Sequence, residues 1–196
     1  MTESSKLEAH LEQSSSLLVR LGGQHGLAEI VEDSIVFLVD AIEKDKAILT
    51  CGNGGSASDA LHVSGELVGR FHYDRRALNV VCLNSNVTVI TAWANDVSYD
   101  SVFSRQVEAH GRAGGVLWGF STSGNSENIL RAFETAKESG MRTILMTGSD
   151  GGRIGPLADA LISVPGFDAP SAQNMHVVLY HFICAEVELR TRDPRS

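Results

Sequence analysis

Short, uninterrupted apolar runs, each followed by a polar loop and a helical pattern, constrain the fold of this chain most strongly. Four of them are predicted to be buried strands and the last to be a shorter fifth strand: "AILTCG", "ALNVVCL", "GVLWGFS", "RTILMTG" and "ALISVPG". Strands without polar alternation are typical of a parallel sheet that helices cover on both faces. The chain is therefore predicted to be an α/β protein with a doubly wound, mainly parallel five-stranded sheet flanked by helices.

Segments with apolar residues at helical spacing separate these runs. After the first strand, helices are expected near residues 57–70, 86–94, 127–139 and 171–191. One more helix is expected after the loop that begins "NDVSYDS". Before the first strand, two N-terminal helices are expected over residues 5–21 and 27–44. Their apolar faces need a partner surface, which is either the following domain or another subunit.

The length of 196 residues suits one sizeable α/β domain with an appendage, and it is too short for two full domains. Residues 1–45 are expected to be an N-terminal helical segment that serves packing or oligomerisation. Residues 46–196 are expected to be the α/β domain. We expect the two parts to form a single structural unit.

The charge and the cysteine content indicate which kinds of partner the protein can bind and in which cellular compartment it works. The formal net charge is −8 with scattered Lys and Arg, whereas binding to a nucleic-acid backbone needs a clustered basic face. The three cysteines lie far apart in apolar runs, as expected for buried free thiols in a reducing compartment. There is no signal-peptide core and no run of membrane-spanning length. We expect a cytoplasmic protein without a nucleic-acid or membrane partner.

Two polar loops lie where a predicted strand ends and a helix begins. "GNGGS" follows the first strand and "STSGNS" the third, and doubly wound sheets bind ligands at this edge. Glycines allow positive φ, and helix N-termini together with hydroxyl groups can hold a phosphate without any lysine. The alternative is plain N-capping and turn formation. Neither loop has the spacing of a P-loop or a dinucleotide fingerprint.

A second group of polar residues lies on the predicted helices. His62 and Glu66 are four residues apart and share one helix face. On the last helix Gln173 and His181 share a face, whereas His176 points about 140° away from His181. If the two helices meet, their two imidazoles, carboxylate and amide would suit Zn²⁺ or a similar divalent ion. The carboxylate and an imidazole could also move a proton between adjacent carbons. The alternative is that these histidines are surface or capping features.

Four sequence blocks resemble the sugar isomerase (SIS) family: "CGNGGSASDALHVSGELVGRF", "TAWANDVSYDSVFSRQV", "GFSTSGNSENILRA" and "QNMHVVLYHFICAEVE". Within that family they look most like the phosphoheptose isomerases, and the resemblance covers nearly the whole chain. It implies the SIS fold for residues 46–196. It also implies an aldose–ketose isomerase that converts D-sedoheptulose 7-phosphate to D-glycero-D-manno-heptose 7-phosphate through a metal-assisted enediol.

The resemblance further implies roles for individual residues. The zinc positions are His62, Glu66, Gln173 and His181, with one Zn²⁺ per subunit, and Glu66 and His181 form the acid–base pair. The substrate contacts are Asn53, Gly54, Gly55, Glu66, Asn95, Asp96, Ser121, Thr122, Ser123, Ser126 and Gln173. A phosphorylated seven-carbon sugar is the implied ligand. A homotetramer with active sites at subunit interfaces is implied as well, which would account for the apolar N-terminal helices.

Other interpretations of the sequence stay open. One branch of the family acts by binding the replication initiator protein DnaA, and such a scaffold need not keep the four metal positions that this chain has. A phosphosugar-sensing regulator would need a DNA-binding domain, and no helix-turn-helix pattern with a basic face occurs. Departures from the family pattern at Asn174 and in "DAPSAQ" and "NSNVTVIT" leave room for another sugar phosphate. Asp59, one turn before His62, is expected to orient either a substrate or that histidine.

Overall fold

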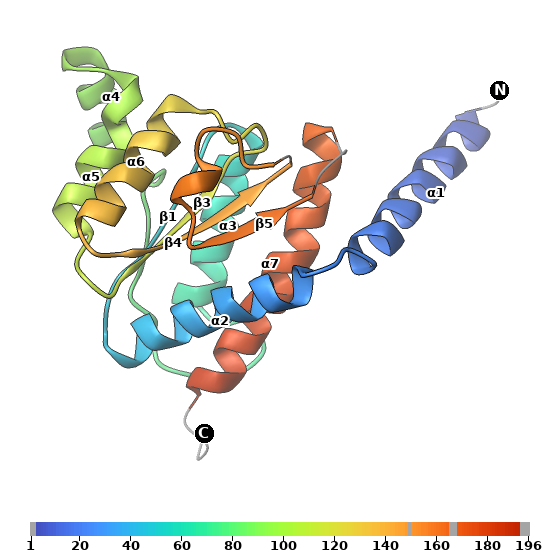
Figure 1. Ribbon diagram of the computed structural model, residues 1–196, viewed down its shortest axis with the longest axis horizontal. Coiled ribbons are helices and arrows are strands. Elements are labelled where there is room, and N and C mark those ends of the chain that lie inside the picture. Colours follow the sequence, from blue (N-terminus) through green and yellow to red (C-terminus); the bar gives the residue numbers. More distant parts are fainter. Residues whose placement is uncertain (1–2, 149, 165–167, 193–196) are drawn as a thin grey trace.

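The protein is built around one parallel β-sheet, which the computed structural model shows in Figure 1; residues 3–148, 150–164 and 168–192 are described. The strands are β1 (Ile48–Gly52), β2 (Val80–Cys82), β3 (Val116–Phe120), β4 (Arg142–Thr147) and β5 (Ala160–Ser163). Their order is β2-β1-β3-β4-β5, and every neighbouring pair is parallel. The predicted α/β fold with five strands is confirmed, and the sheet is parallel throughout. The last two residues of the run "ALISVPG" lie outside the described residues.

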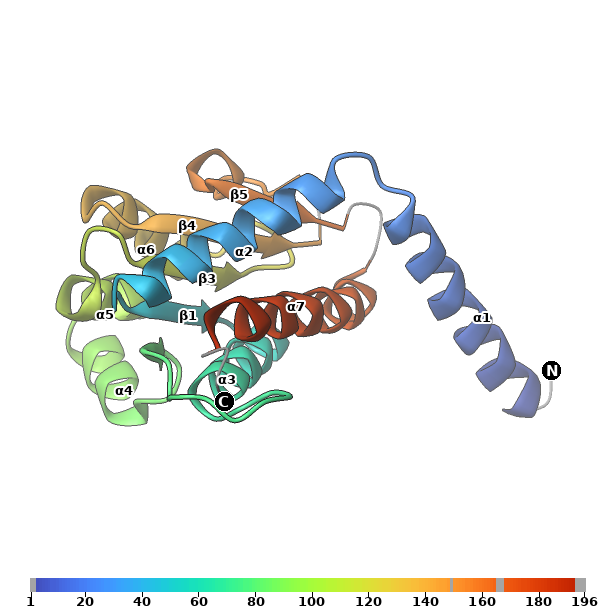
Figure 2. The same ribbon diagram turned by 90° about the horizontal axis from the view of Figure 1, so that it is seen from below.

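Helices cover both faces of the sheet, and they account for the apolar character of its strands. One face carries α2 (Leu27–Glu43), α3 (Gly55–Val68) and α7 (Ala169–Thr191), which are seen side by side in Figure 2. The other face carries α4 (Val87–Asp96), the short 3₁₀ turn η1 (Tyr99–Ser101), α5 (Val102–His110) and α6 (Glu127–Glu138). A second 3₁₀ turn, η2 (Gly155–Leu157), precedes β5. Every residue of β1 and β3 is buried, so neither strand has a solvent-exposed face.

The α2 helix belongs to the main core. Ile35 and Leu38 are almost completely buried there and pack in the same apolar cluster as Trp118 and Phe120 of β3. Fully burying an aliphatic side chain of this size contributes about 1.5–3 kcal/mol. The second of the two expected N-terminal helices therefore finds its partner surface on the sheet of its own chain.

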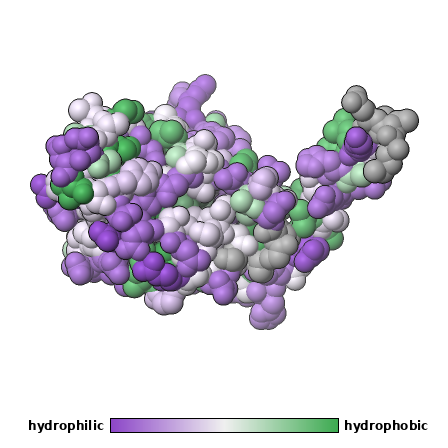
Figure 3. Space-filling view, turned by 90° about the horizontal axis from the view of Figure 1, so that it is seen from above, coloured by the Kyte–Doolittle hydropathy of each residue, from purple (hydrophilic) through white to green (hydrophobic). Residues whose placement is uncertain are grey.

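The first helix has a different environment. α1 (Glu3–Gly22) stands out from the body and contacts it at its C-terminal end, where Leu17 and Leu21 pack against Ala172 and Met175. Farther out, apolar side chains lie in the open, with 60% of Leu7 and 58% of Leu11 exposed. Figure 3 shows such side chains on the projecting helix. No described helix is both long and apolar enough to cross a membrane.

Element boundaries differ from the expected ones at two places that matter for the site. α3 begins at Gly55, two residues earlier than expected, because Gly54 takes a φ of 56° and the chain turns directly into the helix. β2 contains three residues of the run "ALNVVCL", since the N–H of Val80 bonds to the carbonyl of Leu78 in a turn instead of a strand. The first difference brings the N-terminus of α3 closer to the carboxyl end of β1, whereas the second affects the start of β2.

Candidate active site at the carboxyl ends of the strands

Two loops meet at the point where the strand order reverses. β1 lies between β2 and β3, so the chain leaves β1 and β3 toward helices on opposite faces of the sheet. In open α/β sheets ligands bind in the crevice at such a switch point, outside the carboxyl ends of the strands. The two loops predicted from sequence, "GNGGS" and "STSGNS", follow β1 and β3 and lie at this edge.

The first loop is held tightly by backbone contacts. Asn84 brackets Gly52 with its side-chain amide, accepting from Gly52 N at 3.2 Å and donating to Gly52 O at 2.8 Å. A Cβ at Gly52 would collide with the backbone of Ser56, so the turn into α3 requires glycine there. The first loop is therefore fixed at the start of α3, which is the kind of position where helix N-termini bind anions.

Asn53 joins the first loop to the second. Its amide exchanges two hydrogen bonds with Asn128 of α6, at 2.8 and 2.9 Å, and Tyr99 Oη donates to Asn53 Oδ1 at 2.9 Å. Asn128 is 3% exposed, so this amide pair is a fixed part of the site. Tyr99 and Asn128 were not predicted as site residues from the sequence. Asn128 lies two residues after the serine loop and Tyr99 three residues after "WAND", and this closeness to predicted contacts could have pointed to both residues.

The second loop has the geometry of an anion cradle. Gly124 adopts a φ of 64°, and a Cβ at this position would collide with the carbonyl group of Gly151. Ser123 accepts from Asn125 N at 3.2 Å in a local turn. Ser126 stands at the N-cap of α6 but makes no side-chain capping bond, so the first amides of this helix keep their donors. Ser121 Oγ and Ser126 Oγ lie 3.4 Å apart across the loop. The predicted role of this loop in binding a phosphate stays a prediction.

The predicted imidazole–carboxylate group comes together between α3 and α7, about two helical turns or more beyond the first loop. His62 Nε2 lies 3.0 Å from Glu66 Oε1 on α3 and 3.3 Å from His181 Nε2 on α7. One ligand atom from each residue can be chosen so that all three lie within 4.8 Å of one another. Three Lewis-basic atoms that face one point are the arrangement expected around a divalent cation.

The electrostatic setting of His181 favours its neutral form. Partial burial lowers the pKa of His181, the neighbouring His62 lowers it further, and the Glu66 carboxylate acts in the opposite direction. The side chain of His62 is 43% exposed and that of Glu66 is 23% exposed, so the group is open to a ligand from the crevice. A neutral imidazole can bind a metal or accept a proton.

Gln173, the fourth predicted ligand, contacts the first loop. Its side-chain amide rests on Gly55, where an added Cβ would be 2.7 Å from Gln173 Cδ. Because α7 rises by 1.5 Å per residue, the Cα atoms of Gln173 and His181 are about 12 Å apart along the helix axis. The structure thus places Gln173 beside the glycine loop. Its predicted role as a metal ligand stays a prediction.

The remaining predicted contacts, Asn95 and Asp96, end α4. Both are exposed, and Asn95 Nδ2 donates to Asp96 Oδ1 at 2.8 Å. They lie three and four residues before Tyr99, whose hydroxyl reaches the first loop. This places the end of α4 on the strand edge that carries the other predicted contacts.

Two buried titratable residues lie near the site. Asp59 is 5% exposed, and burial raises its pKa to about 6, while His62 acts in the opposite direction. His176 is completely buried, and burial lowers its pKa to about 4. His176 packs edge-on near Phe120, with ring centroids 6.4 Å apart, so it is a neutral core residue.

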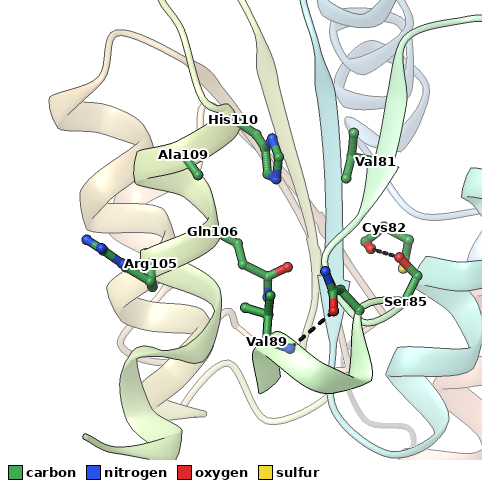
Figure 4. A pocket seen from close by; sticks show the side chains of 9 residues that line it. Val81, Cys82, Ser85, Val89, Arg105, Gln106, Ala109 and His110 are labelled. Carbon is green, nitrogen blue, oxygen red and sulfur yellow. Dashed lines mark hydrogen bonds between the residues drawn. The ribbon is translucent and has the colours of Figure 1, made fainter. Parts of the chain in front are cut away.

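A separate cavity of about 350 Å³ lies between β2, α4 and α5. Figure 4 shows Gln106 and His110 reaching from α5 toward it. Gln106 Nε2 donates to the carbonyls of Leu83 and Val102, both at 3.0 Å, so this amide holds the surrounding backbone together. None of the predicted site residues is among the described residues that line this cavity.

Comparison with known sequences agrees with this geometry. The family model for the SIS domain matches residues 12–148. The phosphoheptose isomerase of Helicobacter pylori is 46% identical over 163 residues, which are 83% of this chain and 85% of that protein. The phosphoheptose isomerase of Citrifermentans bemidjiense is 44% identical over 183 residues, which are 93% of this chain and 94% of that protein.

Solved structures lead to the same family. The phosphoheptose isomerase of Neisseria gonorrhoeae matches with a TM-score of 0.88 at 36% identity, covering 96% of this chain and 100% of that chain. A phosphoheptose isomerase from Francisella tularensis matches with a TM-score of 0.90 at 29% identity and the same coverage. Identity at this level over nearly complete chains, on the fold described above, means that this chain belongs to the SIS-domain family and, within it, to the phosphoheptose isomerases.

Proposed function

We propose that this protein is an aldose–ketose isomerase that converts D-sedoheptulose 7-phosphate to D-glycero-D-manno-heptose 7-phosphate. The observation that carries the proposal is the meeting of His62, Glu66 and His181 at the same sheet edge as two anion-binding loops. A phosphosugar has an anionic end that needs backbone donors and a carbonyl end that needs acid–base groups. The crevice offers both.

We infer that Zn²⁺ is the ion held there, one per subunit. His62, Glu66 and His181 fit it, because two imidazole nitrogens and a carboxylate oxygen within 4.8 Å are borderline ligands of the kind that zinc binds. When bound, the ion would supply Lewis-acid polarisation of the substrate carbonyl. Gln173 stays the predicted fourth ligand, and its place against Gly55 gives more support to its second predicted role, contact with the substrate.

The acid–base chemistry is assigned to Glu66 and His181. Isomerisation moves one proton between C1 and C2 and another between the two oxygens, through a cis-enediol. The Glu66 carboxylate is the base that takes the carbon-bound proton and returns it to the neighbouring carbon. His181, held neutral by its lowered pKa, carries the proton between the oxygens. No atom is gained or lost, so no redox cofactor is required.

The phosphate end is assigned to the second loop. Ser121, Thr122, Ser123 and Ser126 offer hydroxyl groups around the open N-terminus of α6. The sugar hydroxyls are assigned to the first loop and to the end of α4, with Asn53, Gly54, Gly55, Asn95 and Asp96. The Asn53–Asn128 amide pair connects the two ends and supports a fixed distance between phosphate and reacting carbons.

The second candidate function is binding without catalysis, as in the branch of the family that binds DnaA. A scaffold has no need for an imidazole, a carboxylate and a second imidazole that face one point, yet this chain places them so on two different helices. The retained geometry therefore favours the enzyme. An isomerase that acts on another sugar phosphate would use the same residues, and the substrate assay below distinguishes it.

Removal of the metal is expected to abolish turnover. Protein stripped with a chelator should convert D-sedoheptulose 7-phosphate at the background rate, and added Zn²⁺ should restore conversion, because the carbonyl loses its Lewis acid. The product is read by mass spectrometry and NMR. Full activity without any bound metal would contradict the zinc assignment. Zinc binding without turnover of this substrate would point to a different sugar phosphate.

We also propose a homotetramer, with residues 1–45 serving its assembly and residues 46–196 forming the catalytic domain of one structural unit. The exposed Leu7 and Leu11 on α1 support this, since a second copy of the same helix offers a complementary apolar stripe. Introducing charge with Leu7→Glu and Leu11→Glu together should reduce the mass measured by sedimentation equilibrium. Glu12→Gln on the same helix is the control. An unchanged mass in the double variant would argue against assembly through α1.

A further inference from the structure

The hydroxyl group of Tyr99 lies beside the first loop and is held there by a hydrogen bond. Tyr99 Oη donates to Asn53 Oδ1 at 2.9 Å, although Tyr99 itself is 50% exposed. The turn that carries Tyr99 is also fixed, because Trp93 Nε1 of α4 donates to Ser101 Oγ of η1 at 2.9 Å. The tyrosine therefore has a fixed hydroxyl position and a side that a ligand can reach.

The contacts of Asn53 decide which kind of hydrogen bond it can offer to a ligand. An amide oxygen has two lone pairs, and those of Asn53 Oδ1 take the Tyr99 hydroxyl and Asn128 Nδ2–H, the latter at 2.9 Å. One N–H of Asn53 Nδ2 donates to Asn128 Oδ1 at 2.8 Å, and the other has no acceptor among the described residues. Toward a ligand, Asn53 can therefore only donate.

The contacts of Tyr99 leave it the opposite role. Its single O–H proton is used by Asn53, and no group in the described part of the chain donates to its oxygen. Toward a ligand, Tyr99 can therefore only accept. A sugar hydroxyl suits this pair, because it can donate to Tyr99 Oη and accept from Asn53 Nδ2–H. A phosphate dianion suits it poorly, because it has acceptors alone and would face the lone pairs of Tyr99.

We propose that Tyr99 is a substrate-binding residue whose hydroxyl oxygen accepts a hydrogen bond from a hydroxyl group of the sugar chain. The inference rests on the proposed function and adds a residue to its substrate contacts. It also gives the substrate a direction in the crevice. The Asn53–Tyr99 pair accepts the hydroxyl-bearing chain and disfavours the phosphate, which is left to the second loop.

The first test is the steady-state kinetics of Tyr99→Phe in the zinc-loaded, full-length protein. The variant keeps the ring and loses the hydroxyl, so KM for D-sedoheptulose 7-phosphate should rise about 2–10-fold, the equivalent of one neutral hydrogen bond. The value of kcat should stay within about twofold, because a contact made equally in ground and transition states changes KM alone. Tyr73→Phe, 44% exposed after α3, is the matched control and should leave KM unchanged. Thermal melts check that both variants are folded.

Two further measurements separate contact with the sugar from an effect on the shape of the loops. Inorganic phosphate has no sugar chain, so its inhibition constant should be the same in Tyr99→Phe and in the unaltered protein. The second measurement adds Tyr99→Phe to Asn53→Ala. If Tyr99 touches the sugar itself, kcat/KM should still fall about twofold or more in this background, because the contact does not act through Asn53.

The outcomes separate this inference from the proposed function. An unchanged KM in folded Tyr99→Phe would overturn the inference and leave the isomerase standing. Phosphate inhibition that weakens as much as KM rises would also overturn it, as would an effect of Tyr99→Phe that disappears in Asn53→Ala. Absence of turnover of D-sedoheptulose 7-phosphate by the unaltered, zinc-loaded protein would overturn the proposed function and, with it, this inference.

Discussion

Glu66→Gln is expected to lower kcat/KM for D-sedoheptulose 7-phosphate by about 10²–10⁴-fold, the range that one general acid–base group contributes. Glutamine has nearly the same shape but cannot take a proton from carbon. It also replaces the carboxylate oxygen that lies 3.0 Å from His62 Nε2 with a neutral group. The loss should therefore appear mainly in kcat, with part of it in metal content.

Metal analysis of the same variant separates the two roles of Glu66. If Glu66→Gln retains Zn²⁺ and still loses turnover, the carboxylate acts as the base. If adding excess Zn²⁺ restores most of the activity, the carboxylate serves as a ligand, and the base must be another group. Glu138→Gln, an exposed carboxylate on α6, is the control and should keep full activity. Near-normal turnover by metal-replete Glu66→Gln would refute the base assignment.

The fold could be predicted from the sequence because the strands of a covered parallel sheet have a simple sequence pattern. Strands buried on both faces are continuously apolar, as β1 and β3 are, and the helices between them keep a period of 3.6 residues. β2 was predicted too long, because a turn precedes it and the strand begins only at Val80. The Val80–Leu78 hydrogen bond of that turn has no sequence pattern of its own. Local patterns predict elements better than they predict where hydrogen bonding stops.

The site was predictable where its residues share one short segment. His62 and Glu66 are neighbours on one helix face, and the serine loop is contiguous. Contacts between distant segments were harder. Tyr180 stands next to His181 yet touches the opposite nitrogen of His62, and Asn128 meets Asn53 across 75 residues. Whether such residues meet depends on how α3, α6 and α7 pack against the sheet. That packing cannot be predicted from the pattern of a single sequence.

One buried carboxylate of α7 holds the backbone of the segment that follows α3. Glu188 is completely buried, and its two oxygens accept from the backbone N–H groups of Phe71, His72 and Tyr73 at 2.9, 2.6 and 3.1 Å. Arg75 Nε lies 3.2 Å from Glu188 Oε1, and Arg75 also donates to the carbonyl of Glu66 at 2.8 Å. The ring centroids of Phe71 and His181 are 5.6 Å apart, so the segment that Glu188 holds adjoins the proposed active site.

Replacing this carboxylate is expected to be strongly destabilising. Glu188→Gln leaves the Arg75 charge buried without its counter-charge and turns an acceptor toward backbone N–H groups into a donor. Removing one partner of a buried ion pair costs about 3–5 kcal/mol of the free energy of unfolding. Glu186→Gln, two residues earlier on α7, breaks an exposed pair with Arg190 at 3.3 Å and should cost about 0–1 kcal/mol. Urea denaturation at pH 7 measures both.

The free energy of unfolding that Glu188→Gln removes should also depend on pH, and it should decrease as the pH falls. Burial by itself would raise the pKa of Glu188, but three backbone donors and Arg75 outweigh it, so the pKa falls below the ordinary 4.5. A carboxyl group with a lowered folded-state pKa adds stability that is complete above its unfolded pKa and is lost as the pH falls through its folded pKa. The free-energy difference between the unaltered protein and Glu188→Gln should therefore be largest at neutral pH and shrink below about pH 4.5. A free-energy difference that stays constant down to strongly acid pH would show that the charge of Glu188 does not stabilise this segment. A difference no larger than that of Glu186→Gln would show the same.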